Sequence, residues 1–423
     1  MAATAGGVYT LNLAKARLTL CSGPYAFLRH MGLAVPSSAE CERVSQSMIF
    51  TLALRNLFHD RIRLAVTLIG ILFSIVLVAV QLGLYLGSSR MITANIDHAN
   101  ADLWVTAFGA KSFEDGGLLL TGRERHQALA TPGVQAAVPL VVAFAEWRKP
   151  SGGSSRVVVV GSDAEDNGLN TWALTQGTPE DIKAPDAIAV DKSYLAELGI
   201  QGIGDSAQVA SGRVKVRALT EGVRSFTQSP YVYTTLNRSR QLLGAEGDKI
   251  TFLLVKVAPG ADIAQVKANL TSRLETAEVL TTQEFRERSL KQWLFRTGAG
   301  LALIGGAFLG SLVGTVIVAQ TLYSSTKDHI HEFATLRALG SSAGYIHKVI
   351  LAQAGLSAVI GYGLGMTIAL LILYLSRGSA LPLVMTPGLA FWLFALTVAM
   401  CAISALAAIV KVTKIDPATV FAR

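Results

Sequence analysis

The chain has 423 residues, of which 51% are hydrophobic and only 16% are charged, and its mean hydropathy is +0.45. A soluble globular domain has roughly 25% charged residues, so this composition indicates a membrane protein. The net charge of +8 does not indicate a nucleic-acid-binding protein, because the basic residues flank apolar segments.

The first 47 residues differ from the rest of the chain. Residues 1–47 mix Gly, Ser, Pro and scattered charges without a sustained period, and they lack the apolar core and cleavage site of a signal peptide. We expect this tail to be disordered or to result from a mis-assigned start, with Met48 as the initiator. Residues 48–63 place apolar and basic side chains on different faces of a helix. They predict an amphipathic helix in the cytoplasmic membrane interface, and a plain extension of the first span fits them nearly as well.

Four long runs without charged residues follow, at 64–89, 297–326, 349–376 and 378–410, and each exceeds the roughly 20 residues that a spanning helix needs. They predict transmembrane helices at residues 64–87, 293–323, 349–375 and 388–410. A short external connection, 376–387, joins the last two helices, and 411–423 form a cytoplasmic tail. The basic residues flank the spans on one side, which puts both termini in the cytoplasm and residues 88–292 outside it. This basic group comprises Arg55, Arg61, Arg63, Lys327, Arg337, Lys348, Lys411, Lys414 and Arg423.

Residues 88–292 have the length and the pattern of a separate mixed α/β domain. Runs rich in β-branched and aromatic residues predict strands at 102–107, 138–147, 156–161, 187–190, 214–219 and 251–257. Helical spacing predicts helices at 191–198, 236–243, 262–275 and 282–293, and turn-forming residues indicate loops at 148–155 and 222–230. The domain contains no cysteine, so no disulfide stabilises it. Its last helix is expected to continue into the second span as one stiff stalk.

Glycines recur at fixed spacing in two of the spans. Gly306, Gly310 and Gly314 lie four residues apart in the second span, and Gly361 and Gly365 do so in the third. Glycines at this spacing share one helix face and let another helix approach closely. The five positions therefore predict a helix-packing face, either within the chain or between two copies in a homodimer.

The sequence contains none of the common catalytic or nucleotide-binding motifs. The phosphate-binding GxxxxGK[ST] loop is missing, as are HExxH, CxxC and GxSxG. His329, His331 and Glu332 do not converge well on a helix, so no metal site is predicted. The carboxylates of the external loops are expected to interact with solvent rather than to act in catalysis; they are Glu114, Asp115, Asp163, Glu165 and Asp166.

The polar segment 324–348 separates the second span from the third. Phe333, Leu336 and Leu339 lie three residues apart and predict an apolar stripe on a helix that ends at Gly340. Basic residues border this stripe. A helix of this kind, lying flat under the membrane, suits docking to another protein, so we expect a separate motor protein to act on the chain here.

The same segment carries a resemblance to a known family. His331-Glu332-Phe333-Ala334-Thr335-Leu336-Arg337-Ala338-Leu339-Gly340 is similar to the loop R-x-x-E-[IF]-x-x-L-R-A-[LI]-G of FtsX-like permeases of MacB-type ABC transporters, although His329 or Lys327 replaces the leading basic residue. The order of the spans and the external domain resemble this family over residues 48–423. Within the family, the chain length and Gln81-Leu82-Gly83 look closest to DevC-like permeases of tripartite exporters.

The resemblance implies four transmembrane helices and a large MacB-like periplasmic core domain between the first two. It implies a non-catalytic, homodimeric permease subunit of the inner membrane that transmits motion from a separate ATPase, which binds ATP and Mg. The ATPase would contact a coupling helix that includes His331, Glu332, Phe333, Leu336, Arg337, Ala338, Leu339 and Gly340. A periplasmic membrane-fusion adaptor and an outer-membrane channel are the further protein partners implied, as in efflux systems. Membrane lipid is also expected to contact the chain, and nucleic acid is not.

Two other functions stay open at this point. A regulatory member of the same family, of the FtsX or lipoprotein-release type, would drive a cell-wall hydrolase or extract lipoproteins instead of exporting a substrate. A receptor-like sensor would bind a ligand with its outer domain and would need no ATPase. An enzyme is the least favoured class, because the sequence shows no catalytic constellation.

Overall fold

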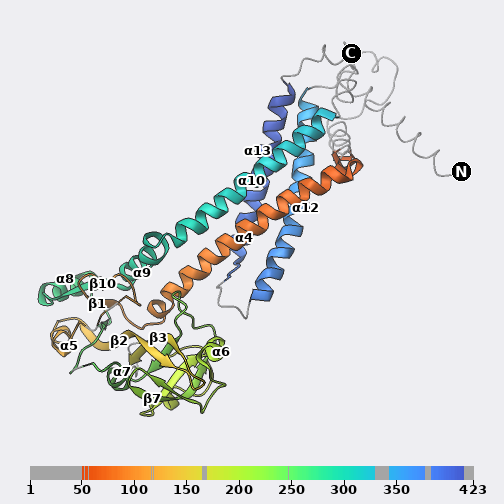
Figure 1. Cartoon of the computed structure of the whole chain (residues 1–423). Helices are drawn as coiled ribbons and strands as arrows, with labels where there is room; N and C mark the ends of the chain where they lie inside the picture. Colours follow the sequence, from red (N-terminus) through yellow and green to blue (C-terminus); the bar gives the residue numbers. More distant parts are fainter. Residues whose placement is uncertain are drawn as a thin grey trace, which may run out of the picture. The chain divides into compact units, whose positions relative to one another are not determined.

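The computed structural model contains a group of long helices and a domain built on one sheet (Figure 1). It describes residues 50–51, 53–55, 57–115, 117, 119–163, 169–245, 247–328, 343–376 and 383–413. The chain divides into two compact units, the helix unit within 1–79, 307–371 and 385–423, and the sheet domain within 80–306 and 372–384. The predicted tail 1–47 and the predicted coupling helix at 331–340 lie outside the described residues.

Four helices in the described part of the chain are long and apolar enough to cross a membrane. They are α4 (Arg61–Asp97), α10 (Ala299–Asp328), α12 (Ala343–Leu375) and α13 (Pro387–Thr413). This agrees with the four spans expected from the sequence. At 1.5 Å per residue α4 is about 55 Å long, whereas the hydrocarbon core of a bilayer is about 30 Å thick. The second part of α4, from residue 80 onward, belongs to the sheet domain.

The sheet domain is built on a mixed sheet of ten strands in the order β10-β1-β9-β2-β3-β8-β5-β7-β4, with β6 paired to β2 and β7. Most pairs are antiparallel, and the pairs β3–β8 and β5–β7 are parallel. Pairing of β1 with β10 brings the strand that follows α4 beside the strand that precedes the last domain helix. The strands are β1 (Leu103–Ala107), β2 (Val134–Arg148), β3 (Ser154–Ser162), β4 (Leu174–Gln176), β5 (Ala187–Asp191), β6 (Ser206–Val209), β7 (Gly212–Thr220), β8 (Tyr231–Thr234), β9 (Phe252–Val257) and β10 (Ala277–Thr281).

Alternating side chains along the strands form a core on each face of this sheet. Trp104 joins the buried cluster on one face, and its neighbours Leu103 and Val105 join the cluster on the other. The end of α4 and helix α9 pack on the Trp104 face, and α5 and α8 pack on the opposite face. The helical segments of the domain are α5 (Gly122–Leu129), η1 (Glu180–Lys183), η2 (Lys192–Tyr194), α6 (Leu195–Leu198), α7 (Leu236–Leu243), α8 (Ile263–Arg273), α9 (Thr282–Leu290) and η3 (Lys291–Arg296).

Aromatic side chains hold α9 on the sheet. Trp104 of β1, Phe252 of β9 and Phe285 of α9 are all fully buried. The ring of Phe285 lies 4.9 Å from that of Trp104 and 5.4 Å from that of Phe252, measured between centroids. Full burial of one such side chain contributes about 1.5–3 kcal/mol. The cluster therefore fixes the helix that leads toward α10.

The structure confirms most of the strands and helices predicted for the domain and adds short ones. The helix predicted at 236–243 agrees with α7 residue for residue, and the predicted loop 148–155 contains the turn between β2 and β3. The sequence did not reveal α5, β4, β6, β8 or β10. β8 and β10 have four and five residues, and runs this short show no period that separates them from loops. What defines these two strands is pairing within the sheet, of β8 with β5 and of β10 with β1.

The prediction that Glu114 is a solvating side chain is wrong. Glu114 is buried and accepts hydrogen bonds from the hydroxyls of Ser225 and Thr227, both at 2.7 Å, and from that of Tyr231. Burial, reinforced by the Glu114 charge, raises the pKa of Tyr231 well above its usual value of 10.0, so the hydroxyl stays a donor. Asp163 also has a structural role, because its carboxylate accepts the backbone N–H of Leu236 at 2.9 Å and caps α7. Asp115 is exposed, and Glu165 and Asp166 lie outside the described residues.

The prediction of a continuous stalk from the last domain helix into the second span is also wrong. α9 passes into the π-helical η3, and the helix stops at Thr297 and Gly298 before α10 begins at Ala299. Gly298 has a φ of 81°, a left-handed conformation that glycine adopts readily and other residues do not. The sequence pattern missed this break because a single glycine costs a helix only about 1 kcal/mol.

Replacing Glu114 with alanine should destabilise the sheet domain by about 3 kcal/mol, because two buried hydroxyls, of Ser225 and Tyr231, and the partly buried hydroxyl of Thr227 lose the carboxylate that accepts their hydrogen bonds. Asp115→Ala removes the exposed neighbouring carboxylate and should have almost no effect. Thermal unfolding of the full chain in detergent, followed by circular dichroism, measures both. Equal melting temperatures for the two variants would contradict the role assigned to Glu114.

Candidate functional site: α4 and its contacts

The candidate site is α4 with the side chains that hold it at its start, its middle and its end. No group of three or more His, Cys, Asp or Glu side chains in the described part of the chain could hold a metal ion. What the described residues do contain is one long helix with specific contacts along its length. The site is therefore built from packing and polar contacts rather than from reacting groups.

A polar clasp joins the start of α4 to the end of α10. The Arg63 guanidinium pairs with the Asp328 carboxylate, and it lies 3.5 Å from Asp60. Asp60 also accepts the backbone N–H of Arg63 at 3.2 Å and caps the helix. These side chains are partly exposed, so each ion pair contributes about 1 kcal/mol or less. The position of the clasp is more informative than its small energy, because Asp328 is the last described residue before the segment 329–342, which contains the predicted coupling helix.

A small polar pocket lies beside the clasp, between α4, α10 and α12. Its lining includes Gln353 and Ser357 of α12, which are buried, and Thr67 of α4. The Ser357 hydroxyl has no hydrogen-bond partner among the described residues. A buried hydroxyl without a partner lowers stability. We infer that this end of the helix unit separates at a lower cost than its apolar middle.

The helical residues that precede α4 touch α12. Residues 53–55 and 57–59 are helical, and Ala53 packs against Val349 in a small buried cluster. Phe50, Leu54 and Phe58 are exposed. Exposed apolar side chains on a helix beside spanning helices suit the membrane interface. The geometry is thus consistent with the amphipathic helix expected from the sequence.

Glycines of α10 face α4. A Cβ added at Gly310 would lie 3.0 Å from an α4 side chain, and one added at Gly314 would lie 2.5 Å from Ser74. The Ser74 hydroxyl donates to the backbone oxygen of Gly310 at 2.8 Å, a contact that needs this short approach. Gly306, in the sheet domain unit, continues the series, since a Cβ there would lie 2.7 Å from the Gln81 side chain. The stripe is therefore occupied within the chain.

Glycines of α12 meet α4 as well. A Cβ at Gly361 would lie 2.5 Å from Ile71, and one at Gly365 would lie 3.0 Å from Ile75. Both isoleucines are buried in a cluster that α4 shares with all three other long helices. The other helices contribute Val318, Leu322, Ile350, Ala354, Ala358, Met400, Cys401, Ala405, Ala408 and Ile409. α4 thus shares one buried cluster with all three other long helices.

The far end of α4 is built into the sheet domain. Ile96 belongs to the same buried cluster as Trp104, and Asn95 accepts a hydrogen bond from the Tyr233 hydroxyl at 2.8 Å. Asp97 lies 3.5 Å from Arg286 of α9. Hydrophobic burial and polar contacts therefore act together here, and the end of α4 is fixed to both the sheet and α9.

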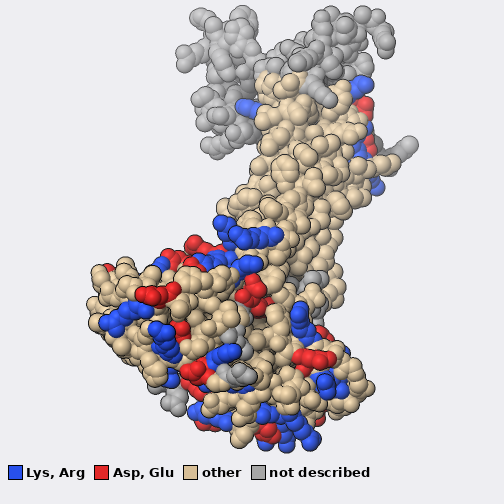
Figure 2. Space-filling model, turned by 60° about the vertical axis from the view of Figure 1, so that its left-hand side comes forward, with Lys and Arg blue, Asp and Glu red and all other residues tan. Residues whose placement is uncertain are grey.

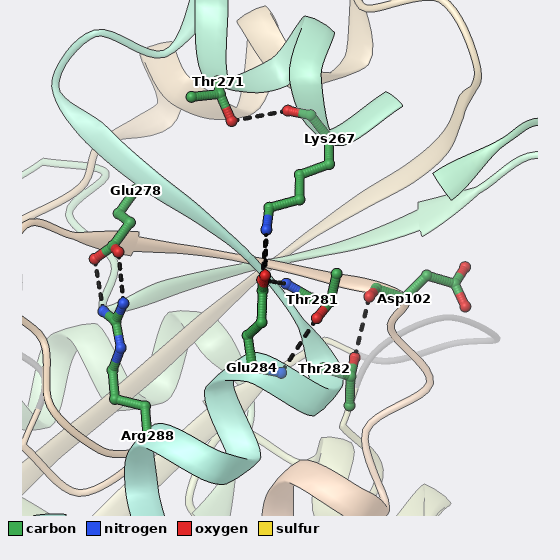
Figure 3. A network of polar contacts seen from close by, with 8 residues as sticks. All are labelled: Asp102, Lys267, Thr271, Glu278, Thr281, Thr282, Glu284 and Arg288. Carbon is green, nitrogen blue, oxygen red and sulfur yellow. Dashed lines mark hydrogen bonds and ion pairs between the residues drawn. The ribbon is translucent and has the colours of Figure 1, made fainter. Parts of the chain in front are cut away.

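A polar network holds α9 on the sheet beside this point (Figure 3). Arg288 of α9 donates to both carboxylate oxygens of Glu278 on β10, at 2.6 and 2.5 Å. Thr281 and Glu284 form a capping box that begins α9, and Glu284 also receives Lys267 of α8 at 2.5 Å. The Arg288 guanidinium, through its hydrogen bonds, lowers the pKa of Glu278 below its usual value of 4.5. The ion pair is therefore charged at neutral pH.

The structure describes some of the residues predicted as functional and leaves others undescribed. Gly306, Gly310, Gly314, Gly361 and Gly365 all face α4, as described above. The predicted coupling-helix residues, from His331 to Gly340, lie outside the described residues, so their role stays a prediction. The anchoring side chains at the end of α4 were not anticipated. Only the Thr-x-x-Glu capping box at the start of α9 had a sequence signal that could have revealed it.

Replacing Gly361 with alanine should destabilise the helix unit by about 1–3 kcal/mol, because the new methyl group overlaps Ile71. Gly363 lies on the same helix, and a Cβ there meets no atom within 4 Å. Gly363→Ala should therefore be neutral or slightly stabilising. Unfolding of the full chain in mixed detergent and denaturant measures the difference, and equal stability of the two variants would contradict the packing of α12 on α4.

The ion pair of Glu278 and Arg288 predicts a pH dependence. Because the folded pKa of Glu278 is lowered, its contribution is complete above about pH 5 and is lost as the pH falls through the folded pKa. Glu278→Gln should lower stability at pH 7 by about 1 kcal/mol and should flatten the loss of stability below pH 5. Glu275→Gln removes an exposed carboxylate nearby and should keep the wild-type slope. Tryptophan fluorescence during unfolding at several pH values measures both slopes, and a parallel slope for Glu278→Gln would refute the assignment.

Two models of known protein families match the chain. The model for the MacB-like periplasmic core domain matches residues 64–273, and the model for the FtsX-like permease C-terminal region matches residues 304–417. Two uncharacterised ABC transporter permeases of Mycobacterium tuberculosis are each 24% identical to the chain, over 379 and 377 residues. Each alignment covers 88% of this chain and 99% of the relative.

Two solved structures are also similar to the chain. The periplasmic region of MacB from Actinobacillus actinomycetemcomitans has a TM-score of 0.35 at 14% identity, covering 46% of this chain and 96% of that one. The extracellular domain of the noncanonic ABC-type transporter YknZ from Gram-positive bacteria has a TM-score of 0.31 at 14% identity, covering 43% and 99%. The two family matches, which together span most of the chain, show that it belongs to the FtsX-like ABC transporter permeases with a MacB-like periplasmic core domain.

Proposed function

We propose that the chain is the permease subunit of an exporter and transmits ATP-driven motion from a separate ABC ATPase to its sheet domain. The ATPase binds ATP and Mg and contacts this chain through the coupling helix at 331–340. Two copies of the chain form a homodimer in the inner membrane with both termini in the cytoplasm. The sheet domain acts on periplasmic partners, a membrane-fusion adaptor and an outer-membrane channel.

The observation that supports this proposal most strongly is the continuity of α4. One helix extends from Arg61, beside the clasp, to Asp97, which lies in the anchored region of the sheet domain. A continuous helix passes on an axial shift or rotation of one end to the other, because each backbone hydrogen bond resists stretching. Movement of the segment after Asp328 would reach α4 through the Arg63–Asp328 ion pair.

The second connection between the spans and the sheet domain differs from the first. α10 is separated from η3 and α9 by the break at Thr297 and Gly298. A glycine in the left-handed region allows the two helices to change their relative direction at little cost. In this proposal α4 transmits the movement and the break before α10 acts as a joint that accommodates it.

Leu336→Asp should abolish stimulation of the partner ATPase, because a charge in the middle of the apolar stripe opposes docking. Ala334→Asp places the same charge on the face that helical spacing puts opposite Leu336, and it should keep most of the stimulation. ATP hydrolysis by the co-reconstituted complex is the measurement. Thermal melting of both variants controls for correct insertion and folding.

Equal coupling in the two variants would contradict the assigned docking face. Failure of any ABC ATPase to copurify with the full chain would contradict transmission itself and would favour a ligand-binding sensor. Cross-linking of the sheet domain in membranes, followed by mass spectrometry, identifies its partner. An adaptor supports export, whereas a cell-wall hydrolase or a lipoprotein supports the regulatory alternative.

A further inference from the structure

Exposed basic and aromatic side chains lie on α4 and on η3, the two segments through which the sheet domain continues into the long helices. Arg90 of α4 and Lys291, Phe295 and Arg296 of η3 are all exposed. We call these four residues the neck cluster. Figure 2 shows basic and acidic side chains mixed over the surface of the sheet domain. Along the chain, Arg90 directly follows the uncharged run 64–89 and Arg296 directly precedes the uncharged run 297–326, so the neck cluster lies where the uncharged segments end.

The π-helical geometry of η3 places three residues of the neck cluster, Lys291, Phe295 and Arg296, on one face. A π-helix bonds residues five apart, so Lys291 lies on the same side as Phe295 and Arg296. Leu294, on the opposite side, is 1% exposed and anchors the segment. Trp293 rests against Phe226 with their ring centroids 5.6 Å apart. The segment is therefore held in place while its basic and aromatic face points away from the domain.

Contacts within the same unit give the level of the neck cluster along α4. The backbone N–H of Val384, in the non-helical connection between α12 and α13, donates to Gly83 at 3.2 Å. The uncharged run of α4 that begins at Leu64 reaches the roughly 20 residues of one span at Gly83, and a non-helical connection suits the edge of the hydrocarbon better than its interior, so Gly83 lies close to this edge. Arg90 is seven residues further along, about 10 Å. The headgroup layer is about 5–8 Å thick, and a long arginine side chain reaches back into it.

The register of α10 on α4 puts the rest of the cluster on the same side of the hydrocarbon edge. Gly306 lies against Gln81, and the two helices run in opposite directions, so Ile304 is near the level of Gly83. Ala299, the first residue of α10, precedes Ile304 by five residues, about 8 Å. Arg296 lies just before the break at Thr297 and Gly298, so it lies beyond this edge, as Arg90 does.

No described residue forms an ion pair with the basic side chains of the cluster, which are Arg90, Lys291 and Arg296. The acidic side chains closest in the chain have other partners, since Asp97 pairs with Arg286 and Glu287 accepts a hydrogen bond from Gln283 at 2.6 Å. Three unpaired cations beside an exposed phenylalanine are the chemistry that suits an anionic membrane surface.

We propose that the neck cluster binds anionic phospholipid headgroups in the leaflet that faces the sheet domain. Arg90, Lys291 and Arg296 contact the phosphates, and Phe295 inserts at the interface. Such binding holds η3 at the membrane surface, directly before the joint at Gly298. The inference rests on the placement of the sheet domain outside the bilayer in the proposed function, and it does not depend on an ATPase.

The test places a photo-cross-linker at the cluster itself. The full chain with Phe295→p-benzoylphenylalanine is reconstituted in nanodiscs of equal phosphatidylglycerol and phosphatidylcholine and is irradiated. Mass spectrometry then counts the lipid adducts at position 295. Phosphatidylglycerol adducts should exceed phosphatidylcholine adducts about two- to fivefold, since one basic residue near a membrane surface is worth about fivefold. The excess should fall toward equality in 0.5 M salt, because salt screens these charges.

Matched variants locate the effect. Arg90→Gln, Lys291→Gln and Arg296→Gln together should bring the ratio close to one. Arg123→Gln, Arg213→Gln and Lys249→Gln remove the same charge from exposed positions elsewhere on the sheet domain and should keep the excess. Melting temperatures show that both variants fold. An unchanged ratio in the first variant, a ratio of one in the parent, or adducts to protein instead of lipid would each overturn the proposal. No ATPase is present, so such a failure is separate from failure of the proposed function.

Discussion

The close approach of α4 to its neighbours is the constraint on which the helix unit depends. Lipid tails are as apolar as the helix surfaces, so association inside a bilayer relies on packing and on hydrogen bonds between helices. Both are present here, since glycines of α10 and α12 admit Ser74 and Ile71, and Ser404 of α13 donates to the backbone of Thr315 at 2.8 Å. A larger side chain at these glycines would push α4 outward and would weaken both the packing and the hydrogen bond from Ser74 to Gly310.

The two ends of α4 are held by different forces, and this difference suits a transmitting helix. At its start α4 has partly exposed ion pairs and a pocket with a buried hydroxyl that lacks a partner among the described residues. At its other end Ile96 is buried in the aromatic core and Asn95 is bonded to Tyr233. Exposed ion pairs break and re-form at low cost, whereas a buried core does not. In the proposed function, rearrangement would therefore be concentrated at the start of α4.

The connection through α10 differs from that through α4, because it contains a break. Arg288, Glu278 and the capping box fix α9 to the sheet, and the chain then breaks at Gly298. Between these two features lies η3, which carries three of the neck-cluster residues. A segment bound to the membrane surface on one side of a joint would keep that joint at a constant depth while α4 moves.

The sequence by itself determined the four apolar helices, most of the strands, and the helix face on which the glycines lie. These follow from local constraints, namely the thickness of a bilayer and the periods of helices and strands. Only the tertiary structure decided that the glycines meet α4, that Glu114 is buried, and that the helix breaks at Gly298. Glu114 and Ser225 are 111 residues apart, and no periodicity in a single sequence shows that two such distant residues will meet. The break, in turn, depends on how α9 and α10 are each held, which the surrounding contacts determine.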